Sequence, residues 1–315
     1  MNTSDPERAP GENPRVAAVT DSRSVNRGAA PVTYGTGRRP PRGDYGRARS
    51  DYTCEQDHSR YTAADHVTYR RLHAQQLQQL PGLACDAFIA AVGHLGPPEQ
   101  IPRFDAISEP LMRATGWQIV AVPGLIPEEA FFALLAQRRF PVTDWIRRPE
   151  EFDYVVEPDV FHDLFGHVPL LFVPAFADYM QAYGAGGLKA SRLDACELLA
   201  RLYWYTVEFG LIHTPQGLRA YGAGILSSAG ELRHSVQSSQ PRRLAFDLQR
   251  IMRSRYRIDS YQAGYFVIDS FDQLFEATAP DFAPLYQQVR KRIALEGEIE
   301  ADVVLSGERE FNAQG

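Results

Sequence analysis

Proline and glycine divide the chain after residue 60 into short segments, which limits the length of its helices. Residues from His66 to Leu80 have helical periodicity and stop at Pro81-Gly82, and a second helical stretch from Ala84 to Gly93 ends before Gly96-Pro97-Pro98. The longest apolar runs, such as residues 170–177, fall well short of the ~20 residues that a membrane helix needs. The pattern argues against a membrane protein and predicts a mainly α domain.

Local signals place the other elements. Thr62, three residues before Asp65, predicts a capped start for the first helix. Residues 117–122 predict a strand that runs into a turn, and the next helix is predicted over residues 127–139, since proline suits a first helical turn. Further helices are predicted over residues 193–212, 242–253 and 271–277, and a further strand over residues 265–268. The expected fold class is a single mainly α domain with a few short strands.

The first fifty residues differ from the rest of the chain in charge and composition. They hold nine Arg, no Lys, five acidic residues, six Pro and six Gly, whereas residues 51–315 hold 24 basic and 34 acidic residues. Such a head cannot bury enough surface to order itself, so we expect a disordered tail over residues 1–50, with a contact segment as the alternative. We expect the domain to cover residues 51–290 and a C-terminal tail to cover residues 291–315. The acidic domain argues against nucleic-acid binding.

The cysteines indicate a reducing environment. Cys54, Cys85 and Cys196 are odd in number and widely spaced, which favours neither a disulfide framework nor a thiolate zinc site. No apolar stretch of the signal-peptide type follows Met1. We therefore expect a cytoplasmic protein without membrane attachment.

The segment from Glu157 to Pro169 (EPDVFHDLFGHVP) is the most informative for chemistry. His162 and His167 stand five positions apart, which places them roughly 140° apart on an ideal α-helix and is poor geometry for a shared metal. We expect the helix to end near Gly166, so that His167 can turn back towards the side that His162 faces.

A third ligand is predicted from the aromatic and apolar stretch YWYTVEFGLI, in which Glu208 is the lone carboxylate. A buried charge needs a partner, and a metal held by two imidazoles would provide one. Two His and one carboxylate suit a non-haem Fe(II) oxygenase, and a zinc hydrolase is the alternative. An ordinary polar role for the histidines and an arginine partner for Glu208 also stay open on spacing alone.

Three stretches resemble a known family: residues 157–170 (EPDVFHDLFGHVPL), 203–211 (YWYTVEFGL) and 221–231 (YGAGILSSAGE), with weaker matches at 116–125 and 140–147. They are similar to the pterin-dependent aromatic amino acid hydroxylases, most of all to the bacterial phenylalanine 4-hydroxylases. The resemblance covers about residues 61–275. It implies the family's mostly helical catalytic domain. Because the chain leaves no room for the regulatory domain and the tetramerisation helix of animal members, it also implies a monomer.

The resemblance also implies roles for individual residues. Iron would be held by His162, His167 and Glu208. A tetrahydropterin would lie along Gly124, Leu125 and Ile126, against Phe131 and near Tyr203. The substrate would meet Arg147 through its carboxylate and would place its ring among Pro158, His162, Trp204 and the loop from Gly224 to Ser227. Ser227 would support a ligand histidine, and Asp159 would do the same or cap the helix.

The activity that this resemblance implies is hydroxylation of L-phenylalanine to L-tyrosine with O2, Fe(II) and a tetrahydropterin, which separate enzymes would recycle. Tryptophan 5-hydroxylation and phenylalanine 3-hydroxylation are alternatives within the family; Trp204 favours phenylalanine over tryptophan. The chain departs from the family at Val155-Val156, where Thr-Pro is frequent, and it has Pro141 where animal members place a histidine near the pterin. We expect deletion of residues 1–50 to leave turnover nearly unchanged.

Overall fold

A computed structural model describes residues 42–313 of the chain, except 154, 156 and 259. Of the tail expected over residues 1–50, residues 1–41 therefore lie outside the described part of the chain. Residues 42–50 are described, and they contact the domain: the Arg47 guanidinium is 2.5 Å from the Asp144 carboxylate.

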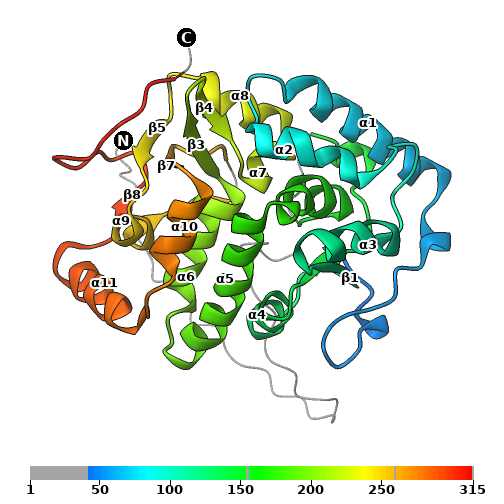
Figure 1. The fold of residues 1–315 in the computed structure, drawn as a ribbon, viewed down its shortest axis with the longest axis horizontal. Coiled ribbons are helices and arrows are strands. Elements are labelled where there is room, and N and C mark those ends of the chain that lie inside the picture. The colour runs from blue at the N-terminus through cyan, green and yellow to red at the C-terminus, as the bar shows by residue number, and fades with distance from the viewer. Residues whose placement is uncertain (1–41, 154, 156, 259, 314–315) are drawn as a thin grey trace, which may run out of the picture. The chain divides into compact units, whose positions relative to one another are not determined.

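Helices make up most of the described structure. The first, α1 (Ala63–Gln79), begins with the predicted capping box between Thr62 and Asp65. Figure 1 shows α5 in the middle of the view, and α4 and α10 pack against it. The helices after α1 are α2 (Asp86–Ala91), α3 (Phe104–Thr115), α4 (Glu128–Ala136), α5 (Pro174–Arg192), α6 (Cys196–Tyr203), α7 (Ala223–Leu226), α8 (Ala229–Gln237), α9 (Leu248–Arg253), α10 (Phe271–Thr278) and α11 (Ala283–Glu296). Shorter helical turns are η1 (Tyr45–Arg47), η2 (His58–Arg60), η3 (Val92–Leu95), η4 (Pro149–Glu151), η5 (His162–His167), η6 (Val168–Phe172) and η7 (Trp204–Glu208).

In the described part of the chain, the strands form one sheet of four strands and two separate pairs. The pairs are β1 (Gln118–Val122) with β2 (Arg139–Thr143), and β6 (Ser254–Arg255) with β8 (Ile299–Glu300), and both are parallel. The larger sheet has the order β4 (Gly217–Ala220), β3 (Gly210–Thr214), β7 (Gly264–Ile268), β5 (Arg242–Ala245). Only β3 and β4 are antiparallel in it. A mainly α fold with a few short strands is confirmed. Among the described residues, no helix combines the length and the apolar character needed to span a bilayer.

Two predicted helices were wrong in part, and in both cases strand pairing explains the difference. The helix expected over residues 193–212 consists of α6 and η7, and its last part is β3, which pairs in parallel with β7. The helix expected over residues 242–253 begins instead as β5, also paired with β7. Asp247 then caps α9 by accepting from the Arg250 backbone N–H. The partner strand β7 lies far ahead in sequence, so helical periodicity alone could not reveal this pairing.

The C-terminal residues return to the domain. The expected boundary at residue 290 falls inside α11, and β8 pairs with β6 beyond it. The Phe311 N–H donates to the Arg243 carbonyl oxygen at 2.8 Å, so pairing extends almost to the end of the described chain.

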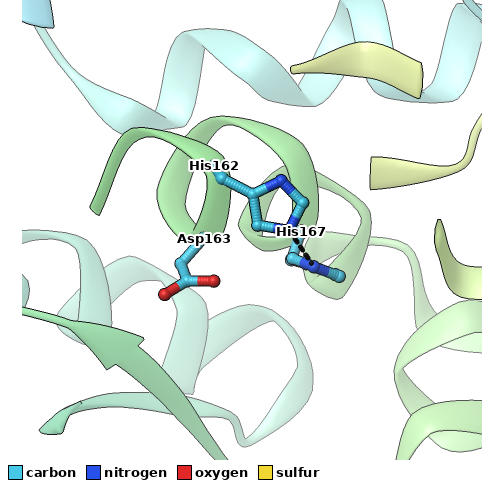
Figure 2. Close-up of side chains that lie close together, drawn as sticks. All are labelled: His162, Asp163 and His167. Atoms are coloured by element: carbon cyan, nitrogen blue, oxygen red, sulfur yellow. Dashed lines mark hydrogen bonds between the residues drawn. The ribbon is translucent and has the colours of Figure 1, made fainter. Parts of the chain in front are cut away.

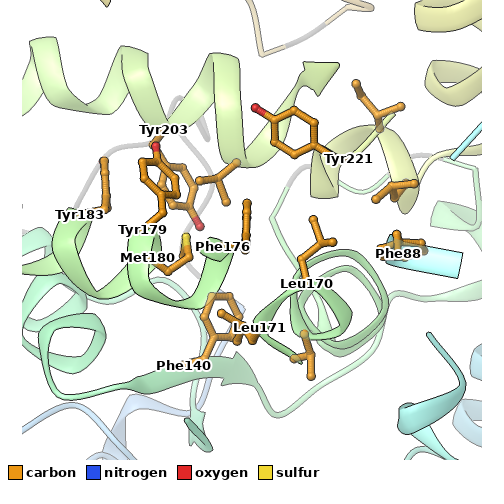
Figure 3. Close-up of a cluster of buried hydrophobic side chains, with 14 of the residues drawn as sticks. Phe88, Phe140, Leu170, Leu171, Phe176, Tyr179, Met180, Tyr183, Tyr203 and Tyr221 are labelled. Carbon is orange, nitrogen blue, oxygen red and sulfur yellow. The ribbon is translucent and has the colours of Figure 1, made fainter. Parts of the chain in front are cut away.

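A continuous apolar core joins the helices to the sheets. Figure 3 shows part of it, where aromatic side chains of α5 such as Phe176 and Tyr179 lie near Tyr203 of α6 and Tyr221. A second, smaller cluster comprises Val122, Ile126 and Leu134 with partly buried neighbours. It packs at the end of β1, next to the turn that follows this strand.

Candidate metal centre and active-site cavity

His162 and His167 lie together because the helix between them is a π-helix. The turn η5 spans both residues, and their Nε2 atoms are 3.2 Å apart (Figure 2). In a π-helix the hydrogen bond joins residue i to i+5, so residues five apart lie one above the other. The expected helix end at Gly166 was therefore wrong: the helix continues through His167 into η6. Gly166 is needed for packing instead, since a Cβ there would lie 2.8 Å from the Ala223 carbonyl oxygen.

Glu208 reaches the same point from a second π-helical turn. It ends η7, and its two carboxylate oxygens are 3.2 Å from His167 Nε2 and 3.6 Å from His162 Nε2. Burial lowers the pKa of His162 to about 4, so this imidazole is neutral and keeps a lone pair. Burial opposes the charge of Glu208, but the neighbouring His167 outweighs it and lowers the pKa of the carboxyl group. The three side chains predicted from the sequence thus converge.

The donor set fits a metal ion. Two ligands that each lie ~2.1 Å from a metal, at angles of about 90° to 110°, are separated by about 3.0 to 3.4 Å, close to the distances within this group. Asp163 is a second carboxylate near the two imidazoles, and Figure 2 shows it beside them. However, Asp163 Oδ2 accepts the Thr143 N–H at 2.8 Å, and burial raises the pKa of Asp163 to about 7. Glu208 is therefore the better anionic ligand.

A cavity of about 650 Å³ opens beside this group. Except for Asp159, every residue predicted for the site lines it. They are the three ligand candidates, then Gly124, Leu125, Ile126, Phe131 and Tyr203 from the expected pterin site, and Arg147, Pro158, Trp204, Gly224 and Ser227 from the expected substrate site. Val155 and Pro141, the two departures from the family pattern that the structure describes, also lie in its wall, while Val156 is outside the described residues.

Ser227 contacts His162 as predicted. Its Oγ donates to the Ala223 carbonyl oxygen at 2.8 Å and lies 2.9 Å from His162 Nδ1. Because the hydroxyl hydrogen is used, Oγ accepts from Nδ1–H, which leaves Nε2 of His162 unprotonated towards Glu208.

Asp159 acts on the backbone and on an arginine rather than on an imidazole. Its carboxylate is buried and accepts the His162 N–H at 3.0 Å, as a helix cap does. It also accepts from Arg147 Nε at 2.8 Å and Nη2 at 2.9 Å. Burial alone would raise the pKa of Asp159, but Arg147 outweighs it and lowers the pKa. Asp159 thus fixes Arg147 relative to the start of η5.

Comparison with known proteins identifies the architecture. Residues 47–292 match the family described as biopterin-dependent aromatic amino acid hydroxylase. This chain belongs to that family. It is 63% identical over 240 residues to a phenylalanine-4-hydroxylase of Ralstonia nicotianae, covering 76% of this chain and 77% of that protein. It is 59% identical over 241 residues to a phenylalanine-4-hydroxylase of Chromobacterium violaceum, covering 76% and 81%. The crystal structure of phenylalanine hydroxylase from Chromobacterium violaceum bound to cobalt superposes with a TM-score of 0.81 at 55% identity, covering 84% of this chain and 95% of that one.

Sequence reasoning missed part of this hydroxylase's cavity wall. Glu231 is buried there, accepts from the Tyr265 hydroxyl and from the Gln262 N–H, and has its pKa raised to about 7 by burial. Gln262 in turn accepts from Trp204 Nε1 at 3.0 Å, so it connects Glu231 with Trp204, another residue of the cavity wall. Glu231 stands three residues after Ser228, a spacing typical of a capping box. The sequence therefore suggests a helix-capping residue and gives no sign that Glu231 lines the cavity.

Proposed function

We propose that this chain is a phenylalanine 4-monooxygenase, which converts L-phenylalanine to L-tyrosine with O2, a tetrahydropterin and Fe(II). The observation that carries the proposal is the convergence of three side chains, His162, His167 and Glu208, at one wall of the cavity. Arg147 and the aromatic side chains of Phe131, Tyr203 and Trp204 line the same cavity. The family membership implies a pterin and a metal, and relatives that are 51% to 63% identical over 240 to 251 aligned residues are named phenylalanine-4-hydroxylases. The relatives give no support to tryptophan 5-hydroxylation, phenylalanine 3-hydroxylation or zinc-dependent hydrolysis.

The metal site is proposed for Fe(II). Two imidazoles and one carboxylate leave several coordination positions open, as non-haem iron oxygenases require. When bound, Fe(II) and the reduced pterin supply the electrons with which O2 is cleaved for transfer of one oxygen atom to the ring. The protein's share at this point is to hold three ligand side chains in place and to keep His162 in one tautomer through Ser227.

Arg147 is proposed to bind the substrate carboxylate. A guanidinium has five N–H donors, and three of them are used here, two by Asp159 and one by the Phe152 carbonyl oxygen at 3.3 Å. The two that remain, one on each terminal nitrogen, form a fork that suits a carboxylate. The bound amino acid would then extend its ring along Pro158 and Trp204 towards His162 and Gly224. This wall excludes water from the reacting ring.

The pterin is proposed to lie against Gly124, Leu125 and Ile126. Phe131 and Tyr203 approach each other edge to face there, with ring centroids 5.7 Å apart, and both line the cavity. Phe131 also packs against the small cluster of Val122 and its neighbours, so it is fixed before a ligand arrives. A planar heterocycle gains from stacking on such a ring.

Reconstitution under anaerobic conditions tests the proposal. The protein is loaded with Fe(II) and then given O2, tetrahydrobiopterin and one aromatic amino acid at a time, and the products are separated by chromatography. We expect para-tyrosine from phenylalanine. Preferred turnover of tryptophan, meta-tyrosine as the product, or activity with Zn(II) in place of Fe(II) would each contradict the assignment.

We also propose that the enzyme works as a monomer in the cytoplasm, and that separate enzymes recycle the oxidised pterin. The cysteines support a reducing compartment, because all three are free and Cys54 and Cys85 are buried. Sedimentation of the full chain at micromolar concentration tests the monomer, and a concentration-dependent dimer would contradict it.

A further inference from the structure

The turn after β1 is held from outside the cavity by residues from the N-terminal end of the described chain. We call residues 42–54 the strap and residues 123–126 the cofactor loop. We infer that the strap is a positioning element for the pterin, because the Tyr45 hydroxyl fixes the shape of the cofactor loop. The inference rests on the proposed function, which places the pterin at this loop.

Two strap residues contact the loop directly. The Tyr45 hydroxyl donates to the Leu125 carbonyl oxygen at 2.9 Å. Burial, together with nearby Glu157, raises the pKa of Tyr45 to about 12, so the phenol remains a donor at working pH. Gly43 lies so close that a Cβ there would stand 1.8 Å from the Pro123 carbonyl oxygen. The strap backbone is thus in contact with the loop backbone, and only glycine fits at this position.

Residues of the domain also contact the cofactor loop. Trp145 Nε1 donates to the Pro123 carbonyl oxygen at 3.1 Å. Gly124 has a φ of 154°, and a Cβ there would lie 3.0 Å from both Glu157 Oε1 and the Tyr45 hydroxyl oxygen. A side chain at residue 124 would therefore be strained in its backbone and would displace one of these two groups.

The contacts leave the loop's amide groups available. The carbonyl oxygens of Pro123 and Leu125 accept hydrogen bonds, whereas among the described residues no acceptor is found for the N–H groups of Gly124, Leu125 and Ile126. A pterin ring carries nitrogen and oxygen acceptors along its edge, so donors from consecutive amides suit it. The orientation of these amides depends on the carbonyls of the same peptide planes, and Tyr45 holds one of them.

The strap has anchors that do not involve Tyr45. Arg47 pairs with Asp144 at 2.5 Å, Asp51 pairs with Arg139 at 3.1 Å, and Cys54 bridges to Ala121 of β1. Loss of the Tyr45 hydroxyl therefore leaves the strap in place. The same contacts change the expectation for a deletion: removal of residues 1–41 spares them, whereas removal of residues 1–50 takes away Gly43, Tyr45 and Arg47 and should weaken pterin binding.

The test compares Tyr45→Phe with Tyr52→Phe. Tyr52 belongs to the same strap and packs against the cluster of Val122 and Ile126, but its hydroxyl has no hydrogen-bond partner among the described residues. For Tyr45→Phe we expect the KM for tetrahydrobiopterin, and the dissociation constant of redox-inactive 7,8-dihydrobiopterin measured by calorimetry, to rise on the order of threefold to tenfold, as for the loss of one hydrogen bond. The KM for phenylalanine should stay unchanged, and Tyr52→Phe should match the wild type in every measurement.

Hydrogen exchange of the peptide covering residues 118–131, in protein without pterin, provides a readout that does not depend on turnover. It should be faster in Tyr45→Phe only. Wild-type pterin affinity and exchange in Tyr45→Phe would overturn the inference, and so would equal losses in both variants, which would indicate general destabilisation. If the wild-type protein fails to bind dihydrobiopterin, the proposed function itself fails; if it binds and Tyr45→Phe binds equally well, only the role of the strap fails.

Discussion

Replacement of Ser227 by alanine tests how His162, the first of the proposed metal ligands, is held. Ser227 Oγ uses its hydrogen for Ala223 at 2.8 Å and accepts from His162 Nδ1–H at 2.9 Å. Ser227 is buried and the His162 side chain is only 16% exposed, so water cannot readily take the place of the hydroxyl. In Ser227→Ala the Nδ1–H loses its acceptor whenever Nε2 binds a metal.

Ser227→Ala should destabilise the metal-bound protein more than the metal-free protein. Without a metal, the proton can move to Nε2, which lies 3.6 Å from the Glu208 carboxylate, and the positive end of the N–H then faces that anion. With a metal on Nε2, the proton must remain on Nδ1, and an unsatisfied buried donor costs about 1 to 2 kcal/mol. The expected drop in Fe(II) affinity is therefore about fivefold to thirtyfold. An anaerobic Fe(II) titration against a competing chelator measures it.

Ser235→Ala is the matched control. Ser235 is fully buried, and its hydroxyl donates to the Leu232 carbonyl oxygen at 3.1 Å, but it lies outside the cavity wall. It should lose stability in denaturant without losing affinity for Fe(II). Unchanged affinity in Ser227→Ala, or the same loss in both variants, would refute the reasoning about the tautomer.

Three further outcomes follow from the site. Glu208→Gln removes the anionic ligand and should abolish hydroxylation and lower the iron content after reconstitution while the circular dichroism spectrum is kept; an unaffected rate would mean that another carboxylate binds the metal. Arg147→Lys keeps a charge but loses the fork, so the KM for phenylalanine should rise at least about tenfold, and buried Asp159 should lose about 1 to 3 kcal/mol of stabilisation, as seen in chemical denaturation. Burial raises the pKa of Glu231 from 4.5 to about 7, so the folded protein binds a proton that the unfolded chain releases, and stability falls as the pH rises from about 5 to 7. Glu231→Gln should therefore gain on the order of 2 kcal/mol relative to the wild type between pH 5 and pH 8, and a difference independent of pH would contradict this.

The sequence predicted which three side chains converge better than it predicted the backbone geometry that brings them together. The isolation of Glu208 among aromatic residues, and the motif around His162 and His167, identified three side chains that the structure brings within 3.6 Å of one another. It did not reveal the π-helical turns, because a bond from residue i to i+5 leaves no periodic mark in a segment of six residues. With only α-helical geometry to work from, the prediction brought His167 back towards His162 by ending the helix before it.

Other parts of the site depend on contacts between distant segments. Tyr45 lies in a stretch whose Arg, Pro and Gly content predicts disorder, yet its hydroxyl meets a carbonyl eighty residues ahead. β3 and β5 take strand form because β7 lies between them, although their own residues are compatible with a helix. By contrast, the capping box of α1 depends only on Thr62 and Asp65, and it was predicted correctly.

The π-helical turn η5 bears on how this protein tolerates insertions and deletions. An α-helix reaches the next turn with fewer residues, so losing one residue between His162 and His167 would restore the commoner backbone and place the two histidines four positions apart, a spacing that keeps them on one face of an α-helix. Such a shortened helix would have good backbone bonds and an ordinary composition. The spacing of five residues between the two imidazoles is thus matched to the π-helical form: the same spacing on a regular α-helix would separate them by roughly 140°, so a variant that converts this turn to an α-helix without losing a residue should be more harmful than the one-residue deletion.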